Sequence, residues 1–93
     1  MLTIGLPFYN NESTLADTLR SVFAQSFQDW ELLLVDDGSL DNSLSVAQSV
    51  KDDRVRVISD DRNLGLASRL NQIADIANGQ FLARLDADDL MQT

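Results

Sequence analysis

Short apolar runs alternate along this chain with longer segments in which apolar residues recur every three or four positions. Four of the runs have the length and composition of buried strands: residues 2–6, 30–35, 55–58 and 81–85. The segments between them have the spacing of amphipathic helices, as in the series that follows Thr14: Leu15, Leu19, Val22 and Phe23. This alternation predicts the order β-α-β-α-β-α-β. Right-handed crossovers would then give an α/β fold, a Rossmann-like parallel sheet with helices on its faces.

Finer features of the pattern predict where elements end and which way they face. Pro7 is expected to stop the first strand, because proline is a strong breaker of regular structure. Trp30 is expected in the core at the start of the second strand. In the third helical segment, five apolar residues are expected to face the sheet: Leu66, Leu70, Ile73, Ala74 and Ala77.

The charge balance and the missing residue types narrow the function. The 93 residues include 15 acidic and 7 basic side chains, a net charge of −8. This balance argues against binding to nucleic acid or to an anionic membrane, whereas an anionic small molecule could bind together with a divalent cation. The absence of cysteine and histidine excludes disulfides, thiolate or His-ligated zinc and a histidine base. No apolar run reaches membrane-spanning length and no basic signal-peptide start is present, so we expect a cytoplasmic protein.

Polar and acidic residues follow each of the four predicted strands. They lie in four segments: Pro7 to Glu12, Asp36 to Ser39, Asp60 to Asn63 and Asp86 to Asp89. Parallel strands end at one edge of the sheet, where ligands bind near the point at which strand order reverses, so we expect these segments to converge. Carboxylates brought together repel one another unless a cation or substrate donors offset the repulsion. The alternative is that these acidic loops only cap helices and face solvent.

The acidic segments allow specific chemistry. Asp86 and Asp88 could share one Mg²⁺ or Mn²⁺, with water and phosphate oxygens completing the coordination. The segment that begins with Asp36 and Asp37 could be a simple turn. Alternatively, its side chains could accept hydrogen bonds from base N–H or ribose hydroxyl groups. Tyr9 is either a core or rim aromatic residue or a face for a nucleobase. The sequence contains neither G-x-G-x-x-G after the first strand nor a P-loop motif, which argues against classical dinucleotide binding and P-loop chemistry.

The start of the third helical segment also has two interpretations. Asn63 and Gly65 could form only an N-cap and a tight turn. They could instead bring the N–H groups of a helix N-terminus close to a phosphate.

Taken in order, these motifs resemble those of the family 2 glycosyltransferases, which have the GT-A fold. The resemblance covers essentially the whole chain and rests on four segments in particular: Thr3 to Glu12, Val35 to Ser39, Asn63 to Asn71 and Leu85 to Asp89. It implies transfer of a sugar from a nucleotide-diphosphate donor to an acceptor hydroxyl, with a UDP-sugar as the preferred donor. It further implies inversion at the anomeric carbon and dependence on Mn²⁺ or Mg²⁺.

The resemblance also assigns roles to individual residues. Those expected to contact the base and ribose are Pro7, Tyr9, Glu12, Asp36 and Asp37, with Asp36 preferred to Asp37. Asp86 would lie near the ribose and the metal, and Asp88 would ligate the metal. Arg69 lies in a helix where the family often has a basic residue near the diphosphate, with a surface position as the alternative.

The family's general base and acceptor-binding region lie after the Asp-x-Asp motif, and so beyond Thr93. Residues 1–93 are therefore interpreted as the nucleotide-diphosphate-sugar-binding portion of a truncated GT-A domain, expected to bind the donor without transferring sugar. The acceptor could be a saccharide, a lipid-linked sugar or a protein, and the remaining part could associate peripherally with the cytoplasmic membrane face.

Two other function classes remain as alternatives. One is a non-catalytic module that binds a nucleotide or a divalent ion. The other is a phosphoryl-transfer or receiver-type domain. A receiver domain would need a lysine after a later strand, whereas the only lysine here is Lys51, in or just after a helix.

Overall fold

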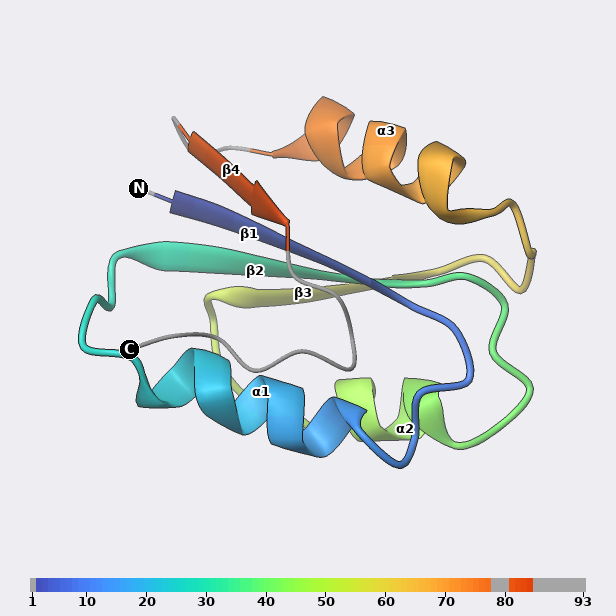
Figure 1. The fold of residues 1–93 in the computed structure, drawn as a ribbon, viewed down its shortest axis with the longest axis horizontal. Coiled ribbons are helices and arrows are strands. Elements are labelled where there is room, and N and C mark those ends of the chain that lie inside the picture. The colour runs from blue at the N-terminus through green and yellow to red at the C-terminus, as the bar shows by residue number, and fades with distance from the viewer. Residues whose placement is uncertain (1, 78–80, 85–93) are drawn as a thin grey trace.

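The computed structural model describes residues 2–77 and 81–84, which fold into a parallel sheet with helices on both faces. Their elements follow the predicted order: β1 (Leu2–Phe8), α1 (Leu15–Ala24), β2 (Trp30–Asp36), α2 (Ser43–Gln48), β3 (Val55–Ser59), α3 (Leu66–Ile76) and β4 (Phe81–Arg84). Figure 1 shows α1 and α2 covering one face of the sheet and α3 covering the other. The predicted α/β fold with a parallel sheet is confirmed.

The strands lie in the order β3-β2-β1-β4, and all of the described pairs are parallel. The chain therefore moves outward from β1 to β3 and then returns through α3 to the other side of β1. Strand order thus reverses between β1 and β4. In open α/β sheets, ligands bind outside the carboxyl ends of the strands at such a point.

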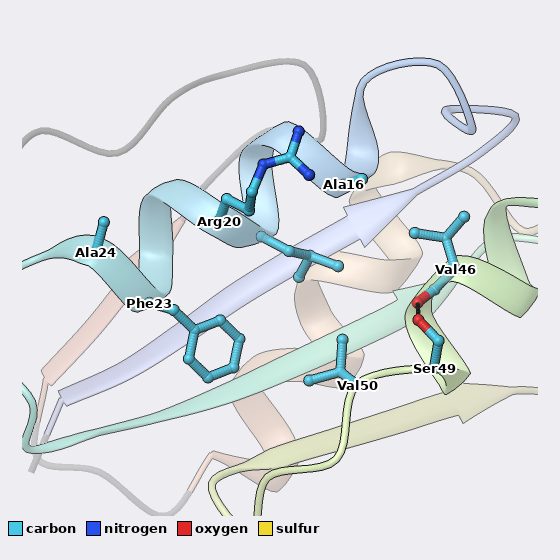
Figure 2. A pocket seen from close by; sticks show the side chains of 8 residues that line it. Ala16, Arg20, Phe23, Ala24, Val46, Ser49 and Val50 are labelled. Atoms are coloured by element: carbon cyan, nitrogen blue, oxygen red, sulfur yellow. Dashed lines mark hydrogen bonds between the residues drawn. The ribbon is translucent and has the colours of Figure 1, made fainter.

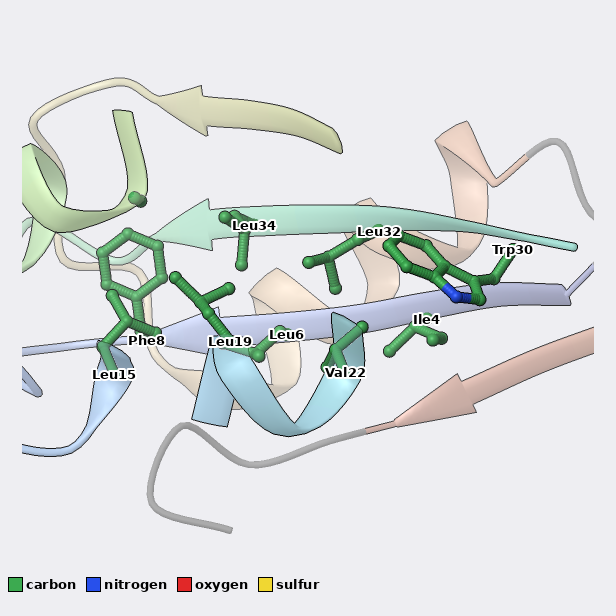
Figure 3. Close-up of a cluster of buried hydrophobic side chains, with 10 residues drawn as sticks. Ile4, Leu6, Phe8, Leu15, Leu19, Val22, Trp30, Leu32 and Leu34 are labelled. Atoms are coloured by element: carbon green, nitrogen blue, oxygen red, sulfur yellow. The ribbon is translucent and has the colours of Figure 1, made fainter. Parts of the chain in front are cut away.

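Both faces of β2 are buried, because alternate side chains pack against opposite helix layers. Leu32 and Leu34 belong to the core beneath α1 and α2, whereas Leu33 and Val35 belong to the core beneath α3. Figure 3 shows the first of these cores, with Trp30 at the end where β2 begins. Trp30 is 1% exposed, which confirms its predicted core position. Burial on both faces explains why this strand is a continuous apolar run in the sequence.

On the other face, a glycine lets α3 pack very close to the sheet. A Cβ atom at Gly5 would lie 2.6 Å from Cγ2 of Ile73, well inside ordinary van der Waals contact. Ile73 is 1% exposed and anchors the core beneath α3. The absence of a side chain at Gly5 therefore sets the distance between the helix and the sheet.

The prediction of which α3 residues face the sheet was partly wrong. Ile73 is buried, but Leu66 and Ala74 are exposed, while the buried residue one turn before Ile73 is Arg69. The spacing of apolar residues could not predict this orientation. It assigns the buried face of a helix to apolar residues, whereas here ion pairs with two carboxylates stabilise the buried charge of Arg69.

The prediction that Pro7 stops the first strand was also wrong, since β1 continues to Phe8 and Pro7 is paired in register with Val35. The Phe8 carbonyl accepts a hydrogen bond from the backbone N–H of Asp37 on the β2 side. Neighbouring residues of a strand alternate in direction, so the nitrogen of Pro7 faces the β4 side. The described pairing with β4 ends at Gly5, so Pro7 removes no donor from it.

Candidate functional site

The loops that follow β1 and β2 are fastened to each other at the carboxyl edge of the sheet. The backbone N–H of Asn10 donates to Oγ of Ser39 at 3.0 Å, and the N–H of Leu40 donates to Oδ1 of Asn10 at 2.7 Å. Asn10 adopts a positive φ of 52°, a conformation that asparagine tolerates better than most residues. The two loops therefore form one braced surface beside the point where strand order reverses.

Three predicted site residues from the first loop differ in their exposure. Tyr9 is 43% exposed, so its ring lies at the rim of the sheet and outside the core. Glu12 is also exposed, and its backbone N–H donates to Oδ2 of Asp41 at 3.2 Å. Pro7 is buried within β1. Among these three, Tyr9 offers the largest apolar face for a ligand.

Asp36, the last residue of β2, is nearly inaccessible. It is 1% exposed, and its carboxylate accepts hydrogen bonds from the Ser39 N–H at 3.0 Å and from the Ser59 hydroxyl at 3.3 Å. Both oxygens are thus used inside the protein. Asp36 holds the turn after β2 and links it to the end of β3.

Asp37 lies at the N-terminal end of α3, although the two are distant in sequence. Its Oδ1 accepts hydrogen bonds from the Leu64 N–H at 2.7 Å, the Gly65 N–H at 3.3 Å and Nε of Arg69 at 2.9 Å, while Oδ2 is 3.2 Å from the Gly65 nitrogen. Burial raises the pKa of this carboxyl, but the backbone donors and the guanidinium more than offset burial and hold the pKa below its usual value. These two N–H groups at the N-terminal end of α3 therefore donate to a carboxylate of the chain itself.

Arg69 lies beneath this edge with a side chain that is 0% exposed, so the surface position considered from the sequence is wrong. Its terminal nitrogens donate to both oxygens of Asp60 at 3.1 and 2.7 Å. They also donate to Oε1 of Gln72 at 3.0 Å and to the carbonyl of Arg62. The guanidinium lowers the pKa of Asp60 to about 2. The repulsion expected among these acids is thus offset by a buried arginine.

The remaining residues of this loop cluster shape its backbone. Gly38 has a φ of +79°, and a Cβ atom there would lie 2.9 Å from the carbonyl carbon of Arg62. The N-cap of α3 is Gly65, whose φ is +91°, so Asn63 is not the capping residue. Instead, the side-chain amide of Asn63 donates to the carbonyl of Asp37 at 3.1 Å. The loop after β3 is therefore fastened to the loop after β2.

The predicted metal ligands Asp86 and Asp88 lie outside the described residues. Within residues 2–77 and 81–84, no three acidic side chains are grouped so that they could hold a metal ion. The described part of β4 runs parallel to β1 and ends at Arg84, in register with Gly5. The metal site therefore stays a prediction.

A separate hollow lies between α1 and α2, on the face of the sheet opposite α3. It has a volume of about 570 Å³ and is lined mainly by apolar side chains such as Phe23, Val46 and Val50. Figure 2 shows that its walls come from α1 and from the region of α2. None of the predicted site residues lines it, so the candidate site remains at the carboxyl edge of the sheet.

Comparisons with known proteins agree on one family. The model of the glycosyl transferase family 2 matches residues 3–93. The putative glycosyltransferase EpsE of Bacillus subtilis is 38% identical over 92 residues, which cover 96% of this chain and 33% of that protein. The Escherichia coli protein WfgD, a UDP-Glc:alpha-D-GlcNAc-diphosphoundecaprenol beta-1,3-glucosyltransferase, is 34% identical over 90 residues, covering 97% and 36%. This chain thus spans about a third of the length of these relatives.

Solved structures show the same fold. S. aureus TarS 1-349 in complex with UDP-GlcNAc superposes with a TM-score of 0.89 at 27% identity, over 96% of this chain and 27% of that one. The mannosyltransferase PcManGT of Pyrobaculum calidifontis, in complex with GDP-Man and Mn²⁺, gives a TM-score of 0.88 at 24% identity, over 99% of this chain and 28% of that one. These neighbours are GT-A enzymes, which confirms the expected GT-A fold. No helix among the described residues is long and apolar enough to span a membrane.

Proposed function

Because this chain belongs to the glycosyl transferase family 2, we propose that the loops at its carboxyl edge bind the nucleotide of a nucleotide-diphosphate-sugar donor in a glycosyltransferase. The observation that carries the proposal is the position of Asp37. Its carboxylate is fixed by α3 and Arg69 at the carboxyl edge of the sheet, in the loop after β2. That loop is braced to the loop after β1, which carries the exposed Tyr9 beside the point where strand order reverses. The relatives named as glycosyltransferases support the activity, and the TarS complexes with UDP and UDP-GlcNAc support a UDP-sugar donor.

Within this site, Asp37 is a better contact for the base than Asp36. Asp37 is 7% exposed and Asp36 is 1% exposed, and both oxygens of Asp36 are already bonded to serine groups. We assign Asp36 to the support of the turn and Asp37 to the N–H group of the base. Tyr9 would pack its ring beside the base, and Glu12 would lie near the ribose. Pro7, buried in β1, would form the floor beneath them.

The carboxylates of Asp86 and Asp88 would hold Mn²⁺ or Mg²⁺, for which oxygen ligands are suited. Such an ion supplies positive charge for the diphosphate and for the departing nucleoside diphosphate. A chain with a net charge of −8 needs such a counter-charge to hold an anionic donor, and Arg69 is already paired inside the protein. Asp86 would lie closer to the ribose than Asp88.

The acceptor hydroxyl, the inverting attack and the general base belong to this proposal as well. We place the base and the acceptor site beyond residue 93, because the relatives are about three times as long as this chain. The name of WfgD includes a diphosphoundecaprenol-linked acceptor, which favours a lipid-linked acceptor over a free saccharide or a protein. A lipid-linked acceptor would bring the enzyme to the cytoplasmic face of the membrane.

The proposal is tested with the full-length protein that carries this sequence. Binding of UDP-sugars and GDP-sugars is measured with and without Mn²⁺, and transfer is measured for wild type and Asp88→Ala. We expect metal-dependent donor binding, and a loss of transfer by about two orders of magnitude in the variant. The matched control is Asp53→Ala, an exposed aspartate just before β3, which should keep full activity. Full activity of Asp88→Ala would refute the metal role, and binding without any transfer would favour the non-catalytic module.

A further inference from the structure

Arg69 has no donor left for a substrate. A guanidinium carries five N–H groups, one on Nε and two on each terminal nitrogen. Nε binds Asp37; one terminal nitrogen binds Asp60 and Gln72, and the other binds Asp60 and the carbonyl of Arg62. Together with a side chain that is 0% exposed, this full set of internal bonds leaves Arg69 unable to reach a diphosphate.

The same bonds join three elements that meet at the candidate site. Asp37 belongs to the loop after β2, Asp60 to the loop after β3, and Arg69 to α3. Asp60 is further fixed by the Arg62 N–H, which donates to its Oδ1 at 3.2 Å. We call this group of Asp37, Asp60 and Arg69 the arginine clamp. It sets the position of α3 relative to the ends of both strands.

The clamp also decides which part of the Asp37 carboxylate remains free. A carboxylate has about four lone-pair sites, two on each oxygen. Oδ1 is engaged by the Leu64 N–H, the Gly65 N–H and Arg69, whereas Oδ2 has, among the residues that the structure describes, a single partner in the Gly65 N–H, at 3.2 Å. One acceptor position, on Oδ2, therefore remains.

We propose that Arg69 is a positioning residue for the nucleotide: by holding Oδ1 of Asp37, it leaves one acceptor, which suits a base whose hydrogen-bonding edge offers a single N–H donor. This inference rests on the proposed donor-binding function. Uracil offers one such group, N3–H. Guanine offers N1–H next to its 2-amino group, a pair that binds best when both oxygens of a carboxylate are available. The clamp thus favours uridine over guanosine diphosphates.

The test is a comparison of UDP and GDP affinities by calorimetry on the full-length protein, with Mn²⁺ present. In Arg69→Lys, a single ammonium cannot replace the planar fork, so Asp37 loses the guanidinium that orients Oδ1 together with the Leu64 and Gly65 N–H groups. We expect UDP binding to weaken about tenfold, the loss typical of one charge-assisted hydrogen bond, while GDP binding changes much less. The matched control is Arg56→Lys, an exposed arginine of β3 outside the clamp, for which both affinities should be unchanged.

A double-mutant comparison separates positioning from general structural damage. If Arg69 acts through Asp37, then adding Arg69→Lys to Asp37→Asn should cause no further loss of UDP affinity. Asp60→Asn keeps the bond between Arg69 and Asp37, and we expect it to change the ratio of UDP to GDP affinity in the same direction but less. It serves as the second variant if Arg69→Lys does not fold.

Three results would overturn the inference while leaving donor binding intact. They are equal wild-type affinities for UDP and GDP, equal losses for both nucleotides in the variants, and an additive loss in the double mutant. A wild-type protein that binds neither nucleotide would instead overturn the proposed function itself.

Discussion

Replacing Gly5 by alanine tests whether the close packing of α3 on the sheet is required for stability. The new Cβ atom would lie 2.6 Å from Cγ2 and 3.2 Å from Cδ1 of Ile73, so the side chain or the helix must move. Overpacking of this kind costs about 1–3 kcal/mol. Alanine is better than glycine within a strand by about 0.5–1 kcal/mol, which offsets part of the cost. We therefore expect a net loss of about 1 kcal/mol in the free energy of unfolding.

The measurement is urea unfolding of wild type, Gly5→Ala, Ile73→Ala and the double variant. Ile73→Ala alone should cost about 2–5 kcal/mol, because it leaves a cavity beneath α3. In the double variant the new methyl group occupies part of that cavity, so Gly5→Ala should then cost nothing or stabilise the protein. Strictly additive losses, or a Gly5→Ala protein as stable as wild type, would refute the idea that Gly5 sets the position of α3.

Two further predictions concern charged groups. The pKa of Asp60 is lowered from 3.8 to about 2, so its stabilising effect is complete above pH ~4 and is lost as the pH falls through ~2. Asp60→Asn should therefore flatten the fall in urea midpoint between pH 4 and pH 2, and a slope equal to that of wild type would contradict the ion pair with Arg69. At the opposite end of the sheet, the guanidinium of Arg54 lies 3.9 Å from the ring centroid of Trp30. Arg54→Ala should lower the free energy of unfolding by about 1 kcal/mol, measured by urea unfolding that is monitored by tryptophan fluorescence. The control is Arg20→Ala. The side chains of Arg20 and Asp17 are 72% and 62% exposed, so their ion pair should contribute almost nothing to stability. Equal losses of stability in both variants would refute a role for the contact with the Trp30 ring.

The order of the elements could be predicted from the sequence because each element has its own local pattern. β2 is buried on both faces and is therefore continuously apolar, while α1 repeats its apolar residues at helical spacing. The end of β1 could not be predicted in the same way. Whether Pro7 interrupts a strand depends on which side its nitrogen faces and whether a partner strand lies there, and both are properties of the whole sheet.

The candidate site also has a part that could be predicted from the sequence and a part that could not. The segments after β1, β2 and β3 meet at one edge because the sheet is parallel, and the sequence alone was sufficient to predict this. The partners of Arg69 were not predictable, because Asp37 is 32 residues away and an arginine in an amphipathic helix is ordinarily assigned to solvent. One local sign was present: Arg69 lies four residues before Ile73, on the face that proved to be buried.

The acidic edge thus contains carboxylates of two kinds, and the difference bears on how an anionic donor can bind there. Asp37 and Asp60 share the charge of Arg69, so this part of the edge carries less uncompensated charge than the sequence suggests. Hydrogen bonds from protein donors hold both carboxylates in place. Asp86 and Asp88 are the acids proposed to use a metal as counter-charge. On this basis the base and the diphosphate would be recognised by separate means, the base by a carboxylate held by the arginine clamp and the diphosphate by an ion that arrives with the donor.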